Sequence, residues 1–122
     1  MKIIRTLLTV AAFGLLPVGC GNQHKAESVV SDFIEANTVN DGYEVMCAPL
    51  DSTDRIPADR MAAMRSAAST DSLFKRGVSL APLSKNDKYA YTRTKIISGT
   101  DTLVRTFYLD MELTHIVAFK QN

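Results

Sequence analysis

Apolar residues recur with a helical period in the segment AESVVSDFIEAN, residues 26–37. The positions i, i+3, i+4, i+7, i+8 and i+11 hold Ala26, Val29, Val30, Phe33, Ile34 and Asn37. This spacing places them on one face of an α-helix, and it leaves Glu27, Ser31, Asp32 and Glu35 on the outer face. We therefore predict an amphipathic helix that ends between Asn37 and Asn40, before a turn at Asp41-Gly42.

The middle of the chain predicts a strand, a loop and a second helix. Residues 43–48, YEVMCA, are apolar on both faces of a strand and end at Pro49, which indicates a position near the core. The loop PLDSTDRI follows, and Pro57 suits the first position of a helix over ADRMAAMRSAAS. Gly77 after two basic residues is typical of a helix C-terminus. The cluster Ser69–Ser72 either breaks this helix in two or is carried within it.

The C-terminal third alternates with a period of two and predicts antiparallel strands. KYAYTRTKIIS and DTLVRTFYLD flank Gly99-Thr100, which suits a two-residue hairpin turn because glycine adopts a positive φ without strain. This turn pairs Ser98 with Asp101, and therefore also the residues Ile96 with Leu103, Thr92 with Phe107, Ala90 with Leu109 and Tyr91 with Tyr108. A turn over residues 110–113 leads to a third strand, THIVAFKQ. VSLA, residues 78–81, predicts a short edge strand before Pro82.

This register divides the hairpin into two faces. One is mostly apolar and carries Ala90, Thr92, Thr94, Ile96, Leu103, Arg105, Phe107 and Leu109. The other is aromatic and basic. We therefore predict an α+β fold in which the N-terminal amphipathic helix and the second helical segment pack on one face of a 3–4-stranded antiparallel sheet.

The first 19 residues have the pattern of an export signal. Lys2 and Arg5 precede an apolar run from Leu7 to Leu16, which is shorter than a membrane-spanning helix and stops at Pro17. Small residues then lead to Cys20. This arrangement resembles a bacterial lipoprotein signal, which implies that residues 1–19 are removed and that Cys20 is acylated and anchors the protein in a membrane. An ordinary secreted protein and an uncleaved membrane helix are the alternatives.

The same resemblance bears on location and domain organisation. The residue after the cysteine is Gly21 rather than aspartate, which favours the outer membrane, with the domain facing the periplasm. Residues 20–25 form the lipidated cysteine and a short extended tether of roughly 20 Å. Residues 26–122 form a single domain.

Composition narrows the classes of function. The net charge of the 122-residue chain is +1, and this near-neutrality gives no support for nucleic-acid binding. Once Cys20 is acylated, only Cys47 remains, so no internal disulfide can form.

The residues that could carry chemistry are few. Cys47 and His115 would suit a thiol–imidazole pair, but a cysteine in an apolar strand is usually a buried hydrophobe. Three scattered Cys and His residues are too few for zinc, and Met61 with Met64 fits core packing better than copper binding. The run Asp51–Asp54 fits a turn better than a cation site. We therefore expect no enzyme activity, no metal and no cofactor.

The aromatic and basic face of the hairpin is the best candidate for a binding site. Aromatic rings beside cations can stack on sugars or rings and can pair with anions, although the same residue types also suit an ordinary solvated sheet face. The candidate ligand-binding residues are Tyr89, Tyr91, Arg93, Lys95 and Tyr108.

The order of elements is similar to that of small α+β lipoproteins of the cystatin-like or nuclear transport factor 2-like type. This resemblance implies a binding fold and carries over no catalytic residue. We expect a membrane-anchored module that binds a small ligand or an envelope protein. A structural accessory subunit of an envelope complex is the alternative.

Overall fold

The predicted hairpin forms the centre of the sheet in the computed structural model, which describes residues 17–39, 42–53, 56–75 and 78–121. Strand β3 (Tyr89–Ser98) pairs with β4 (Asp101–Leu109), and every predicted pair is present, from Ser98 with Asp101 to Ala90 with Leu109. Gly99 has a φ of 61°, the left-handed conformation that the turn requires. The predicted register is therefore confirmed.

Five antiparallel strands make up the sheet, whereas three to four were predicted. The order is β1-β3-β4-β5, in which β1 spans Glu44–Cys47 and β5 spans Ile116–Gln121, and β2 (Asp51–Thr53) pairs with β3 beside β1. The expected loop over residues 51–53 is thus a strand. The predicted position of β1 near the core holds for one face, since Val45 packs in the core, but β1 lies at the sheet edge and Met46 on its other face is 48% exposed.

The first helix, α2 (Pro17–Asn37), ends where the sequence predicts but begins earlier. The Gln23 side chain donates to the Ala48 carbonyl at 3.1 Å and accepts from the Leu50 backbone N–H at 2.6 Å. These bonds hold the first turns of α2 against the β1–β2 connection, so residues 21–25 are helical rather than an extended tether. Glu27, predicted on the outer face, is buried and accepts a hydrogen bond from Gln23.

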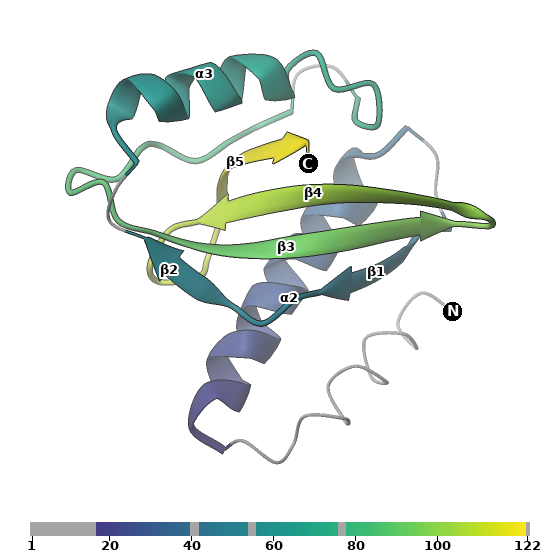
Figure 1. Ribbon diagram of the computed structural model, residues 1–122, viewed down its shortest axis with the longest axis horizontal. Coiled ribbons are helices and arrows are strands. Elements are labelled where there is room, and N and C mark those ends of the chain that lie inside the picture. Colours follow the sequence, from purple (N-terminus) through teal and green to yellow (C-terminus); the bar gives the residue numbers. More distant parts are fainter. Residues whose placement is uncertain (1–16, 40–41, 54–55, 76–77, 122) are drawn as a thin grey trace.

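The second helix, α3 (Ala58–Ala68), covers the opposite face of the sheet from α2 (Figure 1). Ala26, Val30 and Ile34 of α2 pack with Phe107 and other residues of the apolar face. Met61 of α3 instead packs with Tyr89, Tyr108, Val117 and Ala118. The α+β class is confirmed, whereas the placement of both helices on one face is wrong because α3 buries the tyrosines of the other face.

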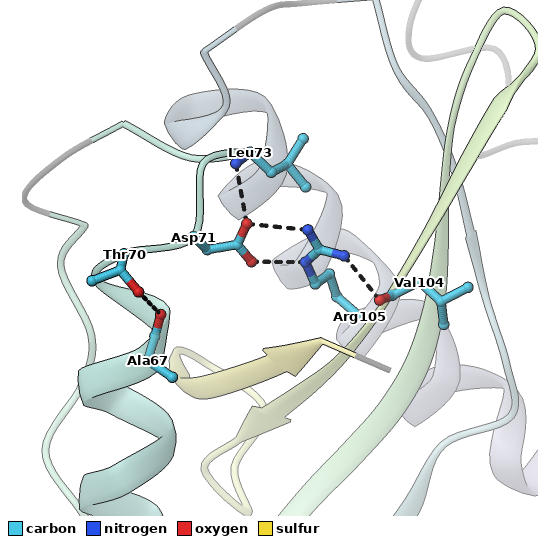
Figure 2. Close-up of polar contacts among 6 residues, drawn as sticks. All are labelled: Ala67, Thr70, Asp71, Leu73, Val104 and Arg105. Atoms are coloured by element: carbon cyan, nitrogen blue, oxygen red, sulfur yellow. Dashed lines mark hydrogen bonds and ion pairs between the residues drawn. The ribbon is translucent and has the colours of Figure 1, made fainter.

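The segment after α3 carries the chain from one face of the sheet to the other. The helix stops at the Ser69–Ser72 cluster, where the Thr70 hydroxyl donates to the Ala67 carbonyl at 2.9 Å. Asp71 then reaches the buried Arg105 of β4 on the α2 side, as Figure 2 shows. Phe74 follows and packs in the α2 core. Gly77, the predicted helix end, lies outside the described residues.

Two further sequence expectations concern loops and membrane spans. Residues 78–81 form no strand, although the Ala81 N–H donates to the Ile116 carbonyl at 2.9 Å. Pro57 precedes α3 as its N-cap residue rather than occupying the first helical position. Within the ranges that the structure describes, neither helix combines the length and the apolar character needed to cross a bilayer.

Candidate functional site

The structure separates the five predicted ligand-binding residues into a buried pair and a more accessible group. Tyr89 and Tyr108 are buried beneath α3, and the Tyr89 hydroxyl accepts a hydrogen bond from the Ser84 backbone N–H at 2.9 Å. Tyr91 is half-buried, whereas Arg93 and Lys95 are exposed. The predicted face is therefore not one continuous solvated surface, because α3 covers the end of it that carries Tyr89 and Tyr108.

A cleft opens where α3 meets the sheet, and two of the predicted tyrosines line it. Tyr91 of β3 and Tyr108 of β4 are paired across the strands, with ring centroids 5.7 Å apart and planes inclined by 38°. Arg60 of α3 and Lys120 of β5 also line this cleft, which has a volume of about 380 Å³. We call it the tyrosine cleft.

The remaining lining of the tyrosine cleft combines hydroxyl and apolar groups. Thr53 of β2 and Thr106 of β4 contribute hydroxyls, and Ile56 and Met64 contribute apolar surface. Pockets for small molecules are commonly apolar with a few convergent polar groups, at volumes of roughly 300–1,000 Å³. The tyrosine cleft lies near the lower end of this size range, and its lining is more polar than apolar.

Burial and a hydrogen bond to Asp51 keep the Tyr91 hydroxyl protonated. Its hydroxyl donates to the Asp51 carboxylate at 3.4 Å. Partial burial raises the pKa of Tyr91, and the Asp51 carboxylate raises this pKa further. Tyr91 is therefore neutral near pH 7, so its ring adds no negative charge to a cleft with two cationic side chains.

Three of the predicted residues, Tyr89, Arg93 and Lys95, lie outside the tyrosine cleft, and several of its residues were not predicted. Arg93 and Lys95 are on the same face but do not line it. Arg60, Lys120, Thr53, Thr106 and both apolar residues were missed. The sequence held one signal for Lys120, since continuing the alternation into the third strand pairs it with Thr106. Arg60 had no such signal, because its position depends on where α3 docks.

The other candidate groups lie apart from one another. Burial raises the pKa of the Cys47 thiol from 9.0 to about 12, and this thiol accepts a hydrogen bond from the Thr94 hydroxyl at 3.6 Å. His115 is exposed in the turn before β5. Cys47 pairs with Thr94 of β3, whereas Ile116, next to His115, pairs with Leu109 and so aligns with Ala90. Four residues of strand, roughly 13 Å, therefore separate their positions along the sheet.

In the described part of the chain, the residues considered above as possible metal ligands contact other groups of the protein. Met61 is fully buried in the core beneath α3, and Met64 packs against the same cluster. The carboxylate of Asp51 accepts from the Ser52 N–H and from Tyr91, while Asp54 lies outside the described residues. Over these same residues, no three His, Cys, Asp or Glu side chains are grouped so that they could hold a metal ion.

Two other hollows are larger than the tyrosine cleft, with volumes of about 570 and 680 Å³. The first contains His115, whose Nδ1 lies 2.9 Å from the Thr114 hydroxyl, and that hydroxyl in turn bonds to Asp110. The second contains Asp71, which is paired with Arg105. Neither hollow is lined by any of the five predicted ligand-binding residues, whereas two of them line the tyrosine cleft, so the tyrosine cleft is the better candidate.

Comparison with models of protein families, with curated proteins and with solved structures gives no match to this chain.

Proposed function

We propose that this protein is a lipid-anchored binding module of a bacterial cell envelope, with the tyrosine cleft as its ligand site. Support for the anchor comes from the charged start, the apolar run and the small residues before Cys20. Gly21 after this cysteine favours the outer membrane, with the domain facing the periplasm. In this role Cys20 carries the acyl chains, and the domain holds its ligand close to the membrane.

The observation that carries the binding role is the composition of the tyrosine cleft. Two tyrosines in tilted ring contact and two cationic side chains, Arg60 and Lys120, line one small cleft where α3 meets the sheet. Aromatic rings offer stacking surface, and cations and hydroxyls offer specific polar contacts. No reacting group is required for this role, so we propose binding without catalysis, metal or cofactor.

Native mass spectrometry of the full-length protein, extracted from bacterial membranes in mild detergent, tests the binding role. We expect a small-molecule adduct on the wild type. Tyr91→Ala should lose it, because the change removes one of the two rings of the cleft. Lys95→Ala is the matched control, since Lys95 is exposed on the same face but outside the cleft. An adduct that survives Tyr91→Ala, or no adduct on any variant, would contradict the proposal.

The open edge of the sheet favours a second candidate function, that of a structural accessory in an envelope complex. β1 pairs with β3 on one side, and its Met46 side chain is 48% exposed. An edge strand can accept a strand from a partner protein through its backbone groups. Site-specific cross-linking from position 46 tests this alternative. A cross-linked envelope protein, together with no small-molecule adduct, would favour it over ligand binding.

A further inference from the structure

Two exposed cationic side chains line the tyrosine cleft, and none of its described lining residues is a carboxylate. Arg60 comes from α3 and Lys120 from β5, so elements far apart in the sequence bring these charges to one cleft. Arg105 forms an ion pair with Asp71. Among the described residues, Arg60 and Lys120 have no such partner. Two exposed cations beside one cleft, with no ion-pair partner among the described residues, favour an anionic group there.

Tyr108 supplies a second, independent indication of a ligand. Tyr108 is only 7% exposed, and it lines the tyrosine cleft. Its hydroxyl has no hydrogen-bond partner among the described residues, in contrast to the hydroxyls of Tyr89 and Tyr91. Buried polar groups are nearly always paired, so this hydroxyl calls for an oxygen or nitrogen atom brought by a bound molecule.

The chemistry of the cleft therefore selects one class of ligand. We infer that the tyrosine cleft binds a small molecule in which an anionic group, such as a phosphate or carboxylate, is attached to a planar ring. Arg60 and Lys120 pair with the anionic group, and the Tyr108 hydroxyl donates a hydrogen bond to it. The ring packs against Tyr91 and the apolar side chains of Ile56 and Met64. This inference rests on the proposed binding function and names the ligand class for the same site.

Three neighbouring ligand classes fit the cleft less well. A cationic ring would gain contact with the tyrosine faces, but Arg60 and Lys120 would both repel it. A neutral ring or sugar would stack on Tyr91 yet leave both cations without a counter-charge. A bare anion would pair with the cations but would not cover the apolar lining. The volume of about 380 Å³ further limits the ligand to a small molecule.

Isothermal titration calorimetry on the full-length protein in detergent tests this inference. It compares the affinities of four probes that vary the ring and the charge. Phenyl phosphate carries both features, inorganic phosphate lacks the ring, benzyl alcohol lacks the charge, and benzylamine reverses the charge. We expect phenyl phosphate to bind at least about tenfold more tightly than either single-feature probe, because each charge-assisted contact contributes on that scale. Benzylamine should not bind.

Three variants assign the binding to this cleft. Lys120→Ala should weaken phenyl phosphate binding about tenfold and leave benzyl alcohol binding unchanged, whereas Lys95→Ala should alter neither. Tyr108→Phe keeps the ring and removes the hydroxyl, so it should weaken phenyl phosphate alone. Thermal melting of each variant verifies that the fold is retained.

The outcomes distinguish this inference from the proposed function. If benzyl alcohol or benzylamine binds as tightly as phenyl phosphate, and Tyr91→Ala abolishes that binding, the cleft is a ligand site but the anionic class is wrong. If phenyl phosphate binding is the same in Lys120→Ala and Lys95→Ala, the cations do not act and the inference fails. If no probe binds the wild type and no adduct is present in native mass spectrometry, both proposals fail.

Discussion

Asp71 and Arg105 form an ion pair that is buried almost completely. The Arg105 Nε lies 2.7 Å from one carboxylate oxygen of Asp71, and its Nη2 donates to the other oxygen at 3.1 Å (Figure 2). Asp71 also accepts from the Leu73 N–H, and Arg105 donates to the Val104 carbonyl. This bidentate geometry compensates the cost of removing both charges from water, and it fixes the segment after α3 to β4.

Removing one partner of this ion pair should destabilise the folded protein. We expect Asp71→Ala to lower the free energy of unfolding by about 3–5 kcal/mol, because it leaves the guanidinium of Arg105 buried without a counter-charge. Urea denaturation measures the loss, with Glu112→Ala at an exposed position as the control. The double variant Asp71→Leu with Arg105→Met should recover much of the stability. A loss below about 1 kcal/mol for Asp71→Ala would show that Arg105 finds solvent when its partner is absent.

Burial of Cys47 predicts a dependence of stability on alkaline pH. Its pKa is raised from 9.0 to about 12 in the folded protein, so the folded state holds the thiol proton more tightly than the unfolded chain does. The contribution of this group to stability is therefore complete below pH 9 and is lost as the pH rises toward 12. Urea unfolding from pH 8 to pH 11 should show a steeper fall for the wild type than for Cys47→Ala. Parallel curves would mean that the thiol is not desolvated in the folded state.

At the scale of the elements, a glycine is required in the hairpin turn, at Gly99, but not in the helix α2, at Gly21. Gly99 adopts a φ of 61° in the turn between β3 and β4, which strains any residue with a Cβ. Gly21 lies within the helix α2, is exposed, and has no neighbouring atom within 4 Å of the position of an added Cβ. The first glycine is therefore required by its conformation, and the second is not.

Matched alanine substitutions should separate these two cases. Gly99→Ala should destabilise the protein by about 1 kcal/mol because of the positive φ. Gly21→Ala should stabilise it by about 0.5–1 kcal/mol, because alanine is the better helix former. Thermal unfolding of both variants beside the wild type gives the signs. Stabilisation by Gly99→Ala would show that the turn can change its type without cost.

The sequence predicts these elements better than it predicts how they pack. The hairpin register follows from local information, namely the turn at Gly99-Thr100 and the alternation on either side of it. The docking of α3 does not, because this helix is rich in alanine and buries only Met61 and Ala68 of its described side chains. Its apolar residues surround the helix, so no stripe indicates which face it covers. The tyrosine cleft depends on this docking, and for this reason only its two tyrosines could be predicted.

At the scale of the whole molecule, the proposed anchor is close to a fixed point of the fold. Cys20 precedes Gln23 by three residues of helix, a rise of roughly 4.5 Å, and Gln23 is bonded to the β1–β2 connection. An acylated Cys20 would therefore hold the domain much closer to the bilayer than an extended tether of roughly 20 Å.

Acylation of Cys20 is tested by its removal. We expect the wild type to partition with membranes, with an intact mass that lacks residues 1–19 and includes acyl chains. Cys20→Ser should leave the protein in the soluble fraction or uncleaved, because the acylated side chain is absent. Cys47→Ser serves as the control for the loss of a thiol elsewhere. A wild type that keeps residues 1–19 at full mass would contradict the lipoprotein proposal.

The distance in sequence between α2 and its binding face bears on how the chain folds as it is synthesised. Val30 and Ile34 of α2 pack with Phe107 and Phe119, more than 70 residues later in the chain. β3, β4 and β5 pair with their neighbours in sequence, so they can form quickly once they are complete. Until then the apolar stripe of α2 can be covered only in part, by earlier residues of the same core such as Val45 and Phe74. Full burial of this stripe therefore waits until the C-terminal strands emerge.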